Sequence, residues 1–90
     1  MAHYIVKDSA AKMPSSCWGR YRRVAVLEVA DTVRDDRDVT AISENAKGVL
    51  RVVRTWERLR DGTTERCAFM RALREAQDVA EALNAAKGAQ

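Results

Sequence analysis

The sequence predicts an α+β fold in which a small antiparallel sheet of two or three strands packs against two amphipathic helices, at about 41–60 and 65–86. Short β-branched runs occur in the first third of the chain, and apolar residues recur every three or four positions over most of the rest. The 90 residues are 47% hydrophobic and 32% charged, which indicates one compact domain over 1–90 rather than a disordered chain.

Two runs near the N-terminus have strand character. Tyr4–Val6 is short, aromatic and β-branched, and the small and polar residues of 8–16 predict a loop after it. Tyr21–Val29 is the stronger strand, because apolar residues alternate onto both of its faces. Val24 and Val26 would point one way, and Ala25, Leu27 and Val29 the other. A strand that is apolar on both faces is predicted to be central or covered on both sides.

The middle of the chain admits two interpretations. Residues 30–38 form a charged turn region, and Val39-Thr40 has the character of a third-strand stub. Over 41–60 apolar residues recur at intervals of four and three, which favours a helix. These residues are Ile42, Ala46, Val49, Val53 and Trp56. A strand over Val49–Trp56 is the alternative, since β-branched residues and Gly48 weaken a helix. We prefer the helix, because a regular strand would mix arginines and valines on the same faces.

The last third predicts a second helix. Gly62 is suited to end the preceding element, and Thr63 or Thr64 can cap the next one. Apolar residues then repeat at intervals of four and three through 65–86. They are Phe69, Leu73, Ala76, Ala80 and Leu83. A turn of about four residues would make the two helices antiparallel neighbours.

Positive charge is unevenly distributed. The 16 basic and 13 acidic side chains give a net charge of +3, and this surplus lies entirely in residues 46–90. Two basic features are candidate binding sites, each with a plain structural alternative. The first is the start of the central strand, where Trp18, Arg20, Arg22 and Arg23 could stack on an anionic group or form a solvated strand edge. The second is a stripe on the predicted helix that could meet phosphates or an acidic partner, or pair with Glu44 and Glu57. Lys47, Arg51, Arg54 and Arg58 form it.

The sequence gives little support for a catalytic site or a metal site. His3 has no nucleophile at motif spacing, and Cys17 and Cys67 have neither metal-ligand spacing nor a disulfide framework. The acidic turn at 31–38 lacks the glycine and closing glutamate of a calcium loop. We therefore expect a non-enzymatic protein without cofactor or metal. The N-terminus lacks a leader pattern and no apolar run has transmembrane length, so we expect a cytoplasmic protein with no membrane partner.

In size, arginine-rich surface and lack of catalytic residues, the chain resembles small phage or mobile-element proteins, and among them anti-CRISPR inhibitors. The resemblance implies a stoichiometric inhibitor that binds a CRISPR effector complex; it rests on no motif, so it assigns no residue a role. Many such inhibitors are acidic mimics of DNA, whereas this chain is basic, which implies an acidic or mixed protein surface as its target. Direct binding of nucleic acid through the same basic surface is the alternative function. A homodimer is compatible with so short a chain.

Overall fold

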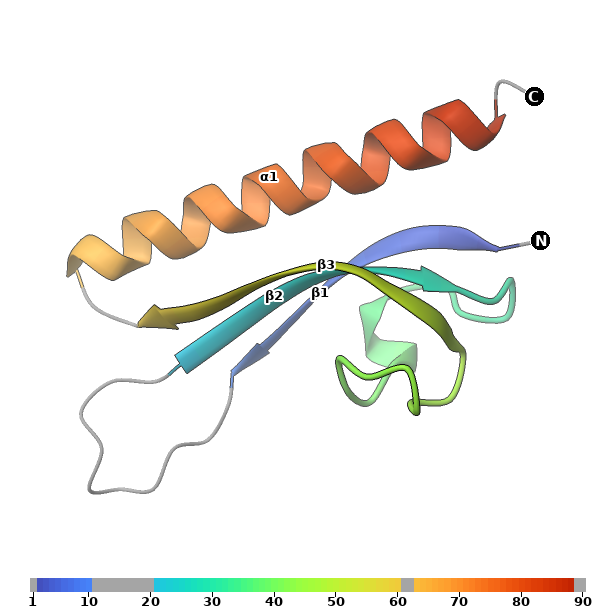
Figure 1. Ribbon diagram of the computed structural model, residues 1–90, viewed down its shortest axis with the longest axis horizontal. Helices are drawn as coiled ribbons and strands as arrows, with labels where there is room; N and C mark the ends of the chain where they lie inside the picture. The colour runs from blue at the N-terminus through green and yellow to red at the C-terminus, as the bar shows by residue number, and fades with distance from the viewer. Residues whose placement is uncertain (1, 11–20, 61–62, 89–90) are drawn as a thin grey trace.

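The computed structural model describes residues 2–10, 21–60 and 63–88. The elements follow in the order β1 (His3–Ala10), β2 (Tyr21–Val29), the 3-10 helix η1 (Asp36–Asp38), β3 (Val49–Arg60) and α1 (Thr63–Gly88). The strands form one antiparallel sheet in the order β1-β2-β3. α1 lies across one face of this sheet, and the 30–48 connection lies on the other (Figure 1). The predicted α+β class and antiparallel sheet are confirmed.

β2 is the central strand, with the bounds predicted from the sequence. Val24 and Val26 are fully buried against α1, and Leu27 and Val29 are fully buried on the opposite face. The two-sided apolar pattern thus reports a strand that is covered on both faces. β1 is longer than the predicted Tyr4–Val6, because pairing with β2 extends it to Ala10.

The prediction of a helix at about 41–60 is wrong. Val49–Arg60 is β3, the alternative that the sequence also offered, and 41–48 consists of turns and bends. The 12 residues of β3 lie opposite the 9 residues of β2, and the pairing shifts register at three places. Each extra residue of a β-bulge resets the alternation of side chains between the two faces. The bulges therefore give β3 spacings of three that imitate a helix.

The apolar stripe assigned to that helix is divided between two cores. Ile42, Ala46 and Val49 pack with Leu27 on the face covered by the 30–48 connection, whereas Val53 and Trp56 pack under α1. The predicted strand stub at Val39-Thr40 is also wrong. Val39 is 1% exposed and fills the first core from the turn that follows η1. The 30–48 connection thus covers this face of the sheet as a second layer, although it consists mostly of turns and bends.

α1 is the predicted second helix, and it extends two residues beyond the expected 65–86 at each end. Ala72, Ala76 and Ala80 form its buried stripe, and Ala76 packs on Val24 and Val26. Such small side chains let the helix axis come close to the sheet. Within the described residues, no helix combines the length and the continuous apolar character that would let it cross a membrane.

Candidate functional site

Two of the predicted binding arginines lie on the helix-covered side of β3. In the register of the sheet, Arg51 lies opposite Glu28 and Arg54 lies opposite Val26. Val26 packs against α1, and Glu28 follows it by two residues on β2, so both arginines lie on that face of the sheet. Both arginines are exposed. We call Arg51, Arg54 and Trp56 the β3 arginine surface.

Arg54 is held by an aromatic contact. Its guanidinium carbon lies 4.5 Å from the centroid of the Trp56 ring, and Trp56 Nε1 donates a hydrogen bond of 3.1 Å to Glu75 Oε2 on α1. A stacked guanidinium keeps the N–H groups in its plane available for a carboxylate or phosphate. The contact between β3 and α1 therefore orients a cation at the surface of the molecule.

Arg51 is held more loosely. Arg51 Nε lies 4.0 Å from Glu28 Oε1, with the two side chains 58% and 23% exposed. Exposed ion pairs at this distance contribute little to stability, so Arg51 can exchange this partner for another anion. Lys47 lies outside the strand. It occupies an exposed position in the turn closed by the hydrogen bond from Val49 N–H to the Ala46 carbonyl.

The structure does not unite the predicted basic residues into one helical stripe. Arg23 is exposed on β2, and its alternation with Ala25 places it on the face opposite to Arg51 and Arg54. Trp18 and Arg20 lie outside the described residues, as do the side chains of Arg22 and Arg58. Of the eight predicted residues, Arg51 and Arg54 are thus shown to share a face.

The acidic turn has a structural use. Asp35 accepts a hydrogen bond from the Arg37 N–H, and Asp38 accepts one from the Arg34 N–H. These carboxylates fix the turn around η1, as short acidic side chains commonly do. Across the described part of the chain, no three histidine, cysteine, aspartate or glutamate side chains are grouped as they would be at a metal site.

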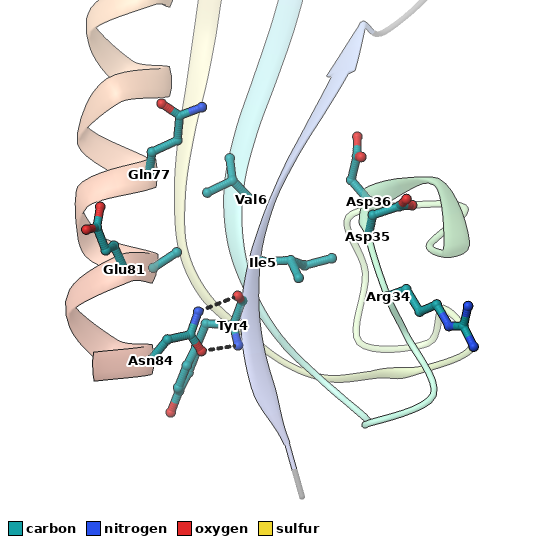
Figure 2. A pocket seen from close by; sticks show the side chains of 10 residues that line it. Tyr4, Ile5, Val6, Arg34, Asp35, Asp36, Gln77, Glu81 and Asn84 are labelled. Atoms are coloured by element: carbon teal, nitrogen blue, oxygen red, sulfur yellow. Dashed lines mark hydrogen bonds between the residues drawn. The ribbon is translucent and has the colours of Figure 1, made fainter. Parts of the chain in front are cut away.

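A further feature has no counterpart in the sequence-based prediction. Asn84 of α1 accepts a hydrogen bond of 2.9 Å from the Tyr4 N–H and donates one of 2.9 Å to the Tyr4 carbonyl (Figure 2). The two residues are 80 positions apart, and no local pattern signals such a contact. Lys87 lies beside the same residue, with its ammonium 5.9 Å from the Tyr4 ring centroid. These contacts attach the end of α1 to the outer strand β1.

We expect Asn84→Ala to expose the Tyr4 amide to solvent exchange. That amide has Asn84 as its hydrogen-bond partner, so its hydrogen exchange should accelerate by about tenfold or more. The Ile5 amide faces β2 and provides the internal control, because its exchange should change little. NMR-detected exchange measures both. A Tyr4 amide that is unprotected in the unmodified protein would contradict the contact.

Comparisons with known proteins give no relatives: no family model, no curated protein and no solved structure matches this chain.

Proposed function

We propose that this chain is a small non-enzymatic binding protein that docks on a partner protein through the β3 arginine surface and inhibits that partner by occupying it. The observation that supports this most is the Arg54–Trp56–Glu75 arrangement. A guanidinium that is already oriented loses less conformational entropy on binding than a free side chain. Arginine and tryptophan are also the residue types that contribute most at protein interfaces.

The charge around this surface favours a protein over a nucleic acid as the partner. Glu28 lies beside Arg51, and Glu75 accepts the hydrogen bond from Trp56, so two carboxylates stand among the arginines. A phosphate backbone would be repelled by them, whereas a protein surface of mixed charge can match both signs. The resemblance to anti-CRISPR inhibitors supplies the partner to test first, which is a CRISPR effector complex.

The test is capture of purified CRISPR effector complexes by the immobilised full chain, together with an interference assay on its expression. We expect capture of at least one complex and loss of interference. Arg54→Ala should weaken capture by about tenfold or more, which corresponds to roughly 1.4 kcal/mol. Its effect on folding stability should stay within about 1 kcal/mol, because the Arg54 side chain is exposed.

Arg37→Ala is the matched control. It removes the same charge from an exposed position of η1, in the connection that covers the opposite face of the sheet, and should bind like the unmodified protein. Absence of capture together with intact interference would refute the inhibitor proposal. A gel shift with DNA or RNA that weakens steeply as salt rises would instead assign the surface to nucleic acid.

A further inference from the structure

The outer edge of β1 carries backbone groups that point away from the sheet. The pairing of β1 with β2 is regular, and Tyr4 directs its N–H and carbonyl outward to Asn84. Because residues two apart in a strand point their backbone groups the same way, Val6 and Asp8 also direct theirs outward. Ile5 and Lys7 direct theirs to β2. No strand of the described chain pairs with this edge.

A groove of about 510 Å³ follows this edge. One wall is α1, through Gln77, Glu81 and Asn84, and the other is the turn at 34–36 (Figure 2). Lys7 Nζ donates a hydrogen bond of 2.9 Å to the Asp36 carbonyl, which fastens the second wall to β1. Tyr4, Ile5, Val6 and Ala80 supply the remaining lining. The groove is thus a strand edge between two fixed walls.

We propose that this groove binds an extended, basic segment of a partner protein, which adds to β1 as a fourth strand. Asn84 shows that the edge accepts such a neighbour, because its amide presents to Tyr4 the donor and acceptor that a peptide group would present. An added strand would continue from that point and pair with Val6 and Asp8. Its alternate side chains would face the two walls in turn.

The charges on the groove walls indicate which kind of extended segment would bind there. The lining holds the carboxylates of Asp35, Asp36 and Glu81 and the guanidinium of Arg34. Two ammonium groups beside it already have neighbours, because Lys7 Nζ donates to the Asp36 carbonyl and Lys87 Nζ lies over the Tyr4 ring. The Asp35 carboxylate accepts the Arg37 N–H, so the carboxylates of Asp36 and Glu81 are the ones left to meet an incoming cation.

Three carboxylates against one guanidinium give the lining residues a net charge of −2, although the chain as a whole carries +3. A second copy of β1 would bring the same three carboxylates of each chain against those of the other. Lysine or arginine on an extended segment would meet them favourably.

The probe is a hexapeptide that alternates valine with lysine, titrated against the full chain by fluorescence anisotropy. It should bind about tenfold or more tightly than a hexapeptide that alternates valine with glutamate. N-methylation of its alternate peptide bonds should also weaken binding by about tenfold or more, because it removes backbone hydrogen-bond donors and keeps the charge. Bound peptide should slow hydrogen exchange at Val6 and Asp8 by about tenfold and leave Ile5 and Lys7 unchanged.

The double substitution Asp36→Lys with Glu81→Lys should reverse the preference between the two peptides, and it leaves the Asp35 cap of η1 and the Asp36 carbonyl in place. Glu44→Lys with Asp78→Lys is the matched control, since it changes the net charge by the same amount at two exposed residues that are not part of the groove lining. Equal affinity for both peptides, or unchanged exchange at Val6 and Asp8 at saturating peptide, would overturn the proposal. So would a concentration-dependent dimer that protects these amides without peptide. The Arg54-dependent capture should survive the double substitution, so the two proposals fail separately.

Discussion

Replacing Leu27 by alanine is expected to lower the free energy of unfolding by about 3 kcal/mol. Leu27 is fully buried near the end of the central strand β2, where it packs with Val29, Val33 and Val49 in the core beneath the 30–48 connection. The substitution removes buried apolar surface and leaves a cavity that the surrounding strands fill only in part. A domain of this size has little stability in reserve, so the loss is a large fraction of the total.

Chemical denaturation measures this loss, and the midpoint of thermal unfolding should fall by roughly 15 °C. Leu50→Ala is the matched control. Leu50 lies on the neighbouring strand β3 but is 56% exposed, so the same chemical change should alter stability by no more than about 0.5 kcal/mol. Similar losses in the two variants would contradict the burial of Leu27 in this core.

Gly48→Ala is expected to lower the free energy of unfolding by about 2 kcal/mol. Gly48 has a φ of 89° in the turn that leads into β3, a backbone conformation that alanine adopts only with strain. A Cβ at this position would also lie 2.6 Å from Val33 Cγ2. The Gly48 carbonyl accepts a hydrogen bond of 2.9 Å from the Ala30 N–H, so movement of the turn would disturb the end of β2.

A double-mutant cycle separates the two causes. If the contact with Val33 contributes, Gly48→Ala should cost less in a Val33→Ala background, with a coupling of about 0.5 kcal/mol or more. If backbone strain alone acts, the cost should be the same in both backgrounds. Urea denaturation of the four proteins measures the cycle. A loss below about 0.5 kcal/mol for Gly48→Ala itself would contradict the positive φ.

The two elements that were predicted correctly have regular local patterns. In β2, successive side chains alternate between the two faces of the sheet with no bulge in the strand itself. In α1, apolar residues repeat at intervals of three and four. In each case the period of the pattern equals the period of the backbone, so the residues that share a face can be read directly from the sequence. The buried Ala76 and Ala80 were predicted by the same reasoning, whereas the buried Ala72 was not.

β3 was mistaken for a helix because its pattern does not follow the period of a regular strand. The extra residues at its register shifts place Val53 on the face of Trp56 and put Val52 on the opposite face. Whether a strand contains bulges depends on its partner, here the shorter β2, and not on its own residues. Two valines in succession therefore fit a bulged strand as well as a helix.

The candidate sites, too, were predictable from the sequence only in part. The sequence by itself determined the central strand, the long final helix and the surplus of arginine in the second half of the chain. Only the tertiary structure decided which arginines share a face, because that depends on the register of β3 against β2. It also decided the contact of Asn84 with Tyr4 and the groove beside β1, since these join residues from distant parts of the chain. Local patterns record the period of each element, whereas the packing of elements brings distant side chains together.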